Sequence, residues 1–320
     1  MIFLVIIVCY RTVSNNWQHS LSTEKEQIYT MAMLNVSGRC VVTEHVLGQG
    51  GFGIVSRVRD AVTAELLALK DIACQNPTAI TSALEEINTL RSLSHPSIIK
   101  LIAADRFFDR HGIPHVRILM EYCSGGNLND RLARPGYDPS KNLKWMRQIA
   151  DALAYLHSRN TVHRDLKPEN VLLTDQVIED IKLADFGLAR NYIALRQNNA
   201  ELNEAQYYMQ TGVGTLHYTA PEVFAGHYTE KSDVFSLGVL FFAIVERCFM
   251  QLPDGKRMYG AFVSIPTYGM VGLGFAMANG YQNSMVTFAQ ASANVQQLIK
   301  NVLSPDYHQR MSAIDVRAQL

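Results

Sequence analysis

A glycine-rich segment from Gly48 to Gly53 lies between two runs rich in β-branched residues, and it limits the possible fold more than any other feature. Glycine lets backbone N–H groups approach a polyphosphate closely, where a Cβ atom would collide. A dinucleotide-binding fold needs a helix directly after such glycines, but here residues 54–60 continue as a strand. The pattern disfavours a dinucleotide fold, and it leaves open a phosphate-binding turn or a plain flexible hairpin.

The residues on both sides of this glycine segment predict several strands and one helix. Ser82 and Glu85 have the spacing of a capping box, and the apolar residues that follow recur at helical spacing until His95-Pro96. We therefore expect one helix, beginning near Ser82, after the third strand. Five runs of β-branched and apolar residues predict strands, the first three of them consecutive and antiparallel, at residues 40–47, 53–60, 64–72, 96–104 and 115–122.

The second half of the chain has helical periodicity instead. Trp145, Ile149, Leu153 and Leu156 fall on one face of a predicted helix. The run 233–248 is apolar on all sides, which is typical of a helix buried among other helices, and it is too short to cross a membrane. A strand-rich first part and a helix-rich second part predict an α+β body with two lobes.

Composition excludes several classes of protein. The 320 residues are 48% hydrophobic and 18% charged, which argues against a disordered regulator, a collagen-like fibre and a long coiled coil. Twenty-nine basic and 29 acidic side chains give a net charge of zero, so we expect no direct binding of nucleic acid. The five cysteines are scattered and odd in number, which indicates neither a disulfide framework nor a zinc site and favours a reducing compartment.

The first ten residues, MIFLVIIVCY, are almost all apolar. A helix of this length would cover about half of the hydrocarbon core, so it predicts no stable membrane span. No basic residue precedes the apolar run, and no small-residue cleavage site follows it directly, so it is a poor signal peptide. An export signal, a short membrane-touching anchor, a packed strand and an artefact of the assigned start all stay open.

Four motifs with the chemistry of phosphoryl transfer follow one another along the chain. They are Leu67-Ala68-Leu69-Lys70, Val162-His163-Arg164-Asp165-Leu166-Lys167-Pro168-Glu169-Asn170, Asp185-Phe186-Gly187 and Ala220-Pro221-Glu222. Phosphoryl transfer needs a carboxylate to orient and deprotonate the attacking hydroxyl and a cation to steady the moving phosphoryl group, and Asp165 and Lys167 match those roles. With these motifs in this order, residues 43–320 resemble the eukaryotic protein kinases.

The resemblance implies a bilobal, protein-kinase-like α+β fold. An antiparallel sheet and one helix would form the N-lobe, and mainly helices would form the C-lobe. Residues 1–39 would be a flexible N-terminal tail and residues 40–320 the kinase domain. Within that domain the resemblance places the N-lobe at 40–119, the hinge at 120–126 and the C-lobe at 127–320.

The resemblance also implies roles for individual residues, with ATP and Mg²⁺ as cofactors. Lys70 would hold the α and β phosphates and pair with Glu86, the neighbouring Glu85 being the alternative partner. The implied catalytic residues are Asp165, Lys167, Lys70 and Glu86. The implied ATP-binding residues are Leu47, Gly48, Gly50, Gly53, Val55, Ala68, Lys70, Met120, Glu121, Cys123 and Leu172. The implied Mg²⁺ ligands are Asn170 and Asp185, because hard oxygen ligands suit that ion.

Further residues would support this site. Leu90, Leu101, His163 and Phe186 would form a stacked column between the lobes, and we interpret Cys123 as a small packed residue rather than a reactive thiol. By resemblance, Asp233 would brace the catalytic loop and Arg310 would pair with Glu222. The activation segment would run from Asp185 to Glu222, with an insertion at 191–210 and Leu216 where proline is frequent. The regulatory candidates in it are Thr211, Thr215, Tyr207 and Tyr208.

The sequence therefore predicts a serine/threonine protein kinase that transfers the γ-phosphate of ATP to protein hydroxyls. The alternative is a catalytically weak or inactive pseudokinase scaffold. Lys167 and the pair Gly214-Thr215 favour the serine/threonine type over the tyrosine type. The segments GGNLND and GKRMYGAFV are similar to kinases that interact with PDZ and LIM domain proteins, which implies cytoskeletal PDZ/LIM-type partners and a location in the nucleus or cytoplasm.

Overall fold

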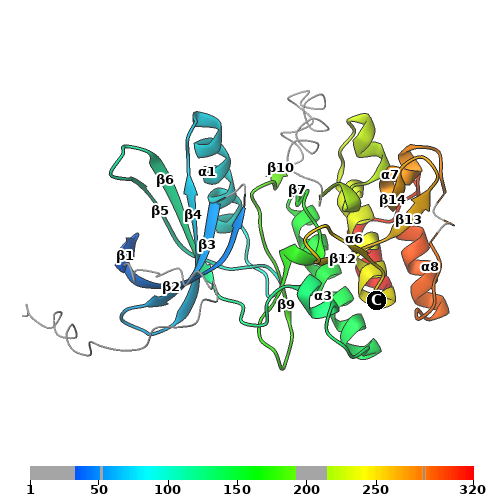
Figure 1. Ribbon diagram of the computed structural model, residues 1–320, viewed down its shortest axis with the longest axis horizontal. Coiled ribbons are helices and arrows are strands. Elements are labelled where there is room, and N and C mark those ends of the chain that lie inside the picture. Colours follow the sequence, from blue (N-terminus) through cyan, green and yellow to red (C-terminus); the bar gives the residue numbers. More distant parts are fainter. Residues whose placement is uncertain (1–32, 51–52, 192–214, 283, 285) are drawn as a thin grey trace, which may run out of the picture. The chain divides into compact units, whose positions relative to one another are not determined.

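The computed structural model describes residues 33–50, 53–191, 215–282, 284 and 286–320. Its first part is one six-stranded sheet in which every neighbouring pair is antiparallel (Figure 1). In spatial order the strands are β1 (Met33–Val36), β2 (Arg39–Gly50), β3 (Gly53–Asp60), β4 (Leu66–Ala73), β6 (Pro114–Glu121) and β5 (Leu101–Phe108). Alternate residues of the sheet are buried, as in β3, where Ser56, Val58 and Asp60 point inward.

The predicted tail, residues 1–39, extends too far, because residues 33–36 already form a strand of the sheet. Met33–Val36 pairs with β2 through the register Met33↔Val42 to Val36↔Arg39, and Val36 is fully buried. A turn at Ser37 and Gly38, both with positive φ, joins the two strands. Four residues are too short a run to show strand periodicity in the sequence, so only the pairing with β2 reveals this strand.

The helix α1 (Pro77–Ser92), the only one that the described residues of this lobe form, starts earlier than predicted. Asn76 is its N-cap, because the Asn76 side chain accepts a hydrogen bond from Ala79 N at 2.9 Å, and Pro77 occupies the first turn. The predicted capping residues Ser82 and Glu85 therefore lie inside the helix. The strand expected at 96–104 is also shifted, since β5 begins only at Leu101.

The second part of the chain is mainly helical, as predicted. The longest helices among its described residues are α3 (Pro139–Ser158) and α6 (Glu230–Glu246), and α6 is buried on nearly all sides. The other helices that the structure describes are α2 (Leu128–Leu132), α7 (Leu273–Ala278), α8 (Ala293–Val302) and α9 (Ala313–Gln319), with 3₁₀ turns η1 (Pro168–Asn170), η3 (Thr215–Tyr218) and η4 (Pro221–Ala225). In the described ranges, we find no helix with the length and apolar character that crossing a membrane requires. This α+β arrangement agrees with the bilobal fold that the resemblance implies.

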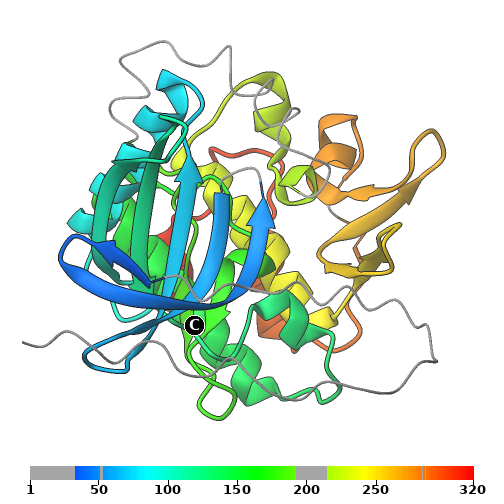
Figure 2. The ribbon, with the colours of Figure 1, turned by 60° about the vertical axis from the view of Figure 1, so that its left-hand side comes forward.

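None of the short strands that the described residues form in this lobe was predicted. Four of them, β11 to β14, form two hairpins away from the six-stranded sheet, the first against α6 and the second against α7 (Figures 1 and 2). The first hairpin pairs β11 (Phe249–Gln251) with β12 (Arg257–Tyr259), and the second pairs β13 (Phe262–Ile265) with β14 (Gly269–Gly272). Strands of three or four residues carry too little alternation to be recognised from sequence.

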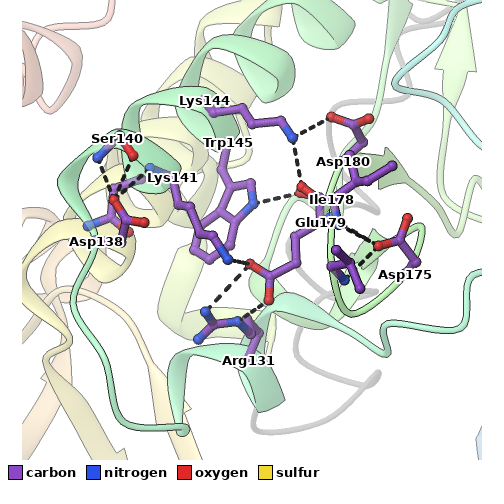
Figure 3. A network of polar contacts seen from close by, with 12 residues as sticks. Arg131, Asp138, Ser140, Lys141, Lys144, Trp145, Asp175, Ile178, Glu179 and Asp180 are labelled. Carbon is purple, nitrogen blue, oxygen red and sulfur yellow. Dashed lines mark hydrogen bonds and ion pairs between the residues drawn. The ribbon is translucent and has the colours of Figure 1, made fainter.

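Two strand pairs of this lobe flank the residues of chemical interest. They are β8 (Val171–Leu173) with β9 (Ile181–Leu183), and β7 (Thr161–Val162) with β10 (Arg190–Asn191). A polar network holds the far end of the β8–β9 hairpin (Figure 3). The buried Glu179 carboxylate accepts from Arg131 Nε at 2.6 Å and Lys141 Nζ at 2.9 Å, and Trp145 Nε1 donates to the Glu179 carbonyl at 2.8 Å. The network ties the hairpin to α2 and α3.

Candidate active site

The glycine segment forms the turn between β2 and β3, and Gly53 is required there by its geometry. Gly53 has a φ of +113°, and a Cβ at this position would lie 2.4 Å from the carbonyl oxygen of Asp71 in β4. At Gly48 and Gly50 a Cβ would meet nothing within 4 Å, so an open space lies beside this backbone. Gly53 thus allows β3 to approach β4, and the open space beside Gly48 and Gly50 fits a bound phosphate chain.

Lys70 in β4 lies between two carboxylates. Its Nζ is 2.8 Å from Glu86 Oε1 on α1 and 3.1 Å from Asp185 Oδ1. The alternative partner Glu85 lies instead 3.3 Å from Arg190 NH2. Burial lowers the pKa of Lys70, but the charges of Asp185 and Glu86 outweigh burial and hold this pKa above its ordinary value. Lys70 is therefore a cation held in place between Glu86 and Asp185.

The loop between β7 and η1 presents Asp165. Lys167 Nζ lies 2.8 Å from Asp165 Oδ2, and Asn170 Nδ2 donates to the same oxygen at 2.9 Å and to the Asp165 carbonyl at 2.8 Å. Asp165 is 4% exposed, so its orientation is fixed by these contacts rather than by solvent. A buried carboxylate held beside an ammonium group can orient a hydroxyl and accept its proton.

Asp233 at the start of α6 holds the backbone of this loop. The N–H groups of His163 and Arg164 donate to its two carboxylate oxygens at 2.8 and 2.9 Å. Arg164 has a φ of +71°, a strained conformation for a non-glycine residue that these hydrogen bonds stabilise. Burial raises the pKa of Asp233, but hydrogen bonding to His157 and the charges of nearby histidines outweigh it and lower the pKa.

Tyr228 also supports the catalytic loop, a role that the sequence analysis did not predict. Its hydroxyl donates to Asp233 Oδ1, and its ring centroid lies 5.4 Å from Arg164 Cζ. No motif marks this tyrosine, because its role depends on a contact with the start of α6 that folding creates. Tyr228 therefore joins the support of the catalytic loop.

The two predicted metal ligands lie on either side of the β8–β9 hairpin, Asn170 before β8 and Asp185 after β9. Burial raises the pKa of Asp185, but the adjacent Lys70 outweighs burial and lowers it, so the carboxylate is ionised at neutral pH. The amide nitrogen of Asn170 already donates to Asp165, and its amide oxygen is a hard donor. One carboxylate and one amide oxygen fit a Mg²⁺ ion whose remaining ligands come from phosphates and water.

The predicted adenine-binding residues lie on neighbouring strands. Ala68 in β4 is paired with Met120 in β6, and Leu67 with Glu121. The Glu121 carboxylate contacts Lys100 N at 2.7 Å and Lys182 Nζ at 2.9 Å, and the Glu121 N–H donates to the Lys100 carbonyl at 3.1 Å. The predicted residues that complete this set are Leu47, Val55, Cys123 and Leu172, of which Leu47 is exposed, Val55 and Leu172 are half-buried and Cys123 is buried.

The predicted column between the lobes is also present in part. The rings of His163 and Phe186 meet edge to face with centroids 5.0 Å apart, and both residues are fully buried. Leu90 belongs to the same hydrophobic core as Phe186, and Leu101 packs against that core. His163 also contacts the Ala184 carbonyl at 3.1 Å, directly before Asp185.

The end of the activation segment is anchored by an ion pair. Arg310 contacts Glu222 through two hydrogen bonds, of 2.8 and 3.1 Å, and Arg310 is 1% exposed. Thr215 is the first residue of η3. The other regulatory candidates, Thr211, Tyr207 and Tyr208, and the predicted insertion beyond residue 191 lie outside the described residues.

Comparison with known proteins agrees with this geometry. The chain is 36% identical over 206 residues to calcium-dependent protein kinase 3 of Plasmodium yoelii yoelii and to calcium-dependent protein kinase 3 of Plasmodium berghei (strain Anka). The match covers 64% of this chain but only 36% and 34% of those two relatives, so the chain spans about a third of their length. The family model for the protein kinase domain matches residues 41–319, and the chain therefore belongs to the protein kinase domain family.

Proposed function

We propose that the protein is an active, magnesium-dependent serine/threonine protein kinase that transfers the γ-phosphate of ATP to protein hydroxyl groups. The observation that carries this proposal is how two charged side chains, Lys70 and Asp165, are held by their neighbours. Lys70 is held between Glu86 and Asp185, and Asp165 is held by Lys167 and Asn170. These contacts support a site that carries out phosphoryl transfer.

Binding of ATP would use the glycine turn and Lys70. The backbone at Gly48 and Gly50 has open space beside it for the phosphates, and the Lys70 ammonium would contact the α and β phosphates. Val55, Ala68 and Leu172 would enclose the adenine ring. Asp185 and Asn170 would hold Mg²⁺, which when bound neutralises charge on the phosphates.

Transfer itself would depend on Asp165. Its carboxylate would accept a hydrogen bond from the substrate hydroxyl, aim that oxygen at the γ-phosphorus and take the proton as the new P–O bond forms. Lys167, 2.8 Å from Asp165, would stabilise negative charge on the transferring phosphoryl group. Lys167 and the Gly214-Thr215 pair support serine or threonine as the acceptor. Cytoskeletal PDZ/LIM-type partners and a nuclear or cytoplasmic location remain predictions.

A transfer assay with Mg-ATP and a generic protein substrate tests the proposal. We expect phosphate transfer by the wild type and a loss of about 10²–10⁴-fold in kcat for Asp165→Asn, because the general base is removed. ATP binding, measured by calorimetry, should be retained in the variant. Asp254→Asn, at an exposed site in the β11–β12 hairpin, is the matched control and should keep full activity. A wild type that binds ATP without transferring phosphate would refute the proposal and favour a pseudokinase scaffold.

A further inference from the structure

The side chain of Arg190 contacts two separate segments beside the candidate active site. Arg190 is the first residue of β10, where it is paired with Val162 of β7. Its NH1 donates to the Ala189 carbonyl at 2.8 Å and to the Gly187 carbonyl at 3.4 Å. Its NH2 lies 3.3 Å from Glu85 Oε2 on α1. One guanidinium group thus contacts both the helix α1 and the backbone that precedes β10.

The backbone that Arg190 holds lies directly against the ion pairs of Lys70. A Cβ built on Gly187 would lie 3.4 Å from Glu86 Oε2 and 3.4 Å from Asp185 Oδ1. The same Cβ would lie 3.8 Å from Lys70 Nζ. Because these groups are in close contact, a shift of the Gly187 backbone would move the carboxylates that hold Lys70.

Glu85 and Glu86 are neighbours on α1 and point in different directions. Successive residues of an α-helix are turned by about 100° from one another, so two neighbouring side chains do not face the same partner. The buried Glu86 contacts Lys70 of β4, whereas the half-exposed Glu85 contacts Arg190 of β10. The helix α1 is therefore held by one ion pair to β4 and by a second ion pair to β10.

The strand that pairs with β10 leads into the catalytic loop. Val162, the partner of Arg190, is the last residue of β7 and stands three positions before Asp165. Through Arg190, α1 is thus connected to the loop that presents Asp165 as well as to the backbone beside Lys70.

We propose that Arg190 and Glu85 are positioning residues for the phosphoryl-transfer site. Their ion pair holds α1 against β10, which keeps Glu86 beside Lys70, while the hydrogen bonds of Arg190 hold the Gly187 backbone. The inference rests on the proposed function only for its effect on transfer, because the positioning itself is measured without a transfer assay.

Hydrogen exchange of α1 measures the positioning directly. Glu85→Gln removes the charge and keeps the shape of the side chain. The side chains of Glu85 and Arg190 are 46% and 26% exposed, so the pair is weak, and amides of residues 80–87 should exchange about two- to fivefold faster. Arg190→Ala also removes two hydrogen bonds and should speed this exchange by about tenfold or more. Arg91→Gln removes an exposed charge from the same helix and, as the matched control, should leave this exchange unchanged.

A double variant tests whether the two side chains act through each other. If they do, Glu85→Gln should cause no further increase in exchange when it is added to Arg190→Ala. Raising NaCl from about 0.05 M to about 0.5 M should speed the exchange of α1 in the wild type but not in Glu85→Gln, because salt screens a partly exposed ion pair. Unchanged exchange in both single variants, or additive increases in the double variant, would overturn the proposal.

ATP binding and kinetics measure the consequence for the site. The Kd for ATP, from calorimetry, should rise at least about twofold in Arg190→Ala, because fewer molecules hold Lys70 in its binding position. The kcat/KM for ATP should fall more in Arg190→Ala than in Glu85→Gln and should not change in Arg91→Gln. A lower Tm with unchanged ATP affinity would show a merely structural role and refute positioning. A wild type that transfers no phosphate would refute the proposed function, whereas exchange and ATP binding would still decide this inference.

Discussion

The thiol of Cys123 is the clearest case of a side chain whose chemistry depends on its surroundings. It lies two residues after the end of β6, and the sequence predicts a packed cysteine there rather than a reactive thiol. The residue is 9% exposed, and burial, with the nearby Glu121 carboxylate, raises the pKa of its thiol to about 12. The nucleophilic thiolate is therefore scarce at neutral pH.

We predict that Cys123 resists alkylation in the folded protein. Iodoacetamide at pH 8 should modify Cys123 at least about tenfold more slowly than the less buried Cys40, as measured by mass spectrometry of peptides. In urea the two rates should become equal, which controls for intrinsic reactivity. Rapid labelling of native Cys123 would contradict the packed interpretation.

Asp233 gives a prediction about pH. A carboxyl whose pKa is lowered on folding stabilises the native state above its unfolded pKa of about 3.9, and this stabilisation is lost as the pH falls through the folded pKa. Asp233→Asn should therefore lower the free energy of unfolding at pH 7 by about 2 kcal/mol, because charge-assisted hydrogen bonds are lost. Urea unfolding between pH 7 and pH 3 should show this difference shrinking in acid. A difference independent of pH would contradict the assignment.

The ends of helices and strands depend on single residues that a periodic pattern does not identify. The helix α1 starts at Pro77 because Asn76 caps it, although a capping-box spacing occurs later, at Ser82. A cap works only where the chain enters the helix, and here Asn76, directly before Pro77, holds that position. Patterns therefore predicted the existence of α1 and its inward face better than its first residue.

The β2–β3 turn gives a prediction at one glycine with a second as its control. Gly53→Ala would place a Cβ against the Asp71 carbonyl, at a φ that alanine rarely adopts. We expect a loss of about 1–3 kcal/mol in the free energy of unfolding and weaker ATP binding, because β3 must move from β4 beside Lys70. Gly50→Ala meets no atom within 4 Å and should leave stability unchanged. Urea unfolding of both variants decides between packing and simple flexibility as the role of Gly53.

The C-lobe is closed by contacts between segments that lie far apart in the sequence. Arg310, near the C-terminal end, is buried against Glu222 and also donates to the Ser304 and Lys231 carbonyls. Ser232 at the start of α6 donates to Glu222 as well. These contacts join the end of the activation segment to α6 and to the loop before α9.

Removing one partner of this pair should be costly. We predict that Arg310→Met lowers the free energy of unfolding by about 3–5 kcal/mol, because Glu222 is left as a buried, uncompensated charge. The double variant Arg310→Met with Glu222→Gln should recover part of that loss. Urea unfolding of the wild type and of the single and double variants measures the coupling. Additive losses would show that the two side chains act independently.

The catalytic loop and the alternation of sheet and helices could be predicted from the sequence. Residues 162–170 are contiguous, so their order and chemistry are visible without a structure, and the predicted strands and helices depend on periods of two and 3.6 residues. The strand Met33–Val36 and the short strands β7 to β14 of the second lobe were missed, because each strand is too short to show a period. The fold class could therefore be predicted from local patterns. The match of the protein kinase domain model to residues 41–319 agrees with that prediction.

The amino-acid order alone thus identifies the chemical groups, the family and the main elements of this protein. Only the folded chain decides which groups meet. Lys70 contacts Asp185 across 115 positions, Asp233 binds the backbone of His163 across 70 positions, and the loop 93–100 is hydrogen-bonded to Leu183 of β9. Each of these contacts depends on how the sheet, α6 and β9 pack together. Periodicity records which face of an element is buried, and it contains no information on the partner that buries it.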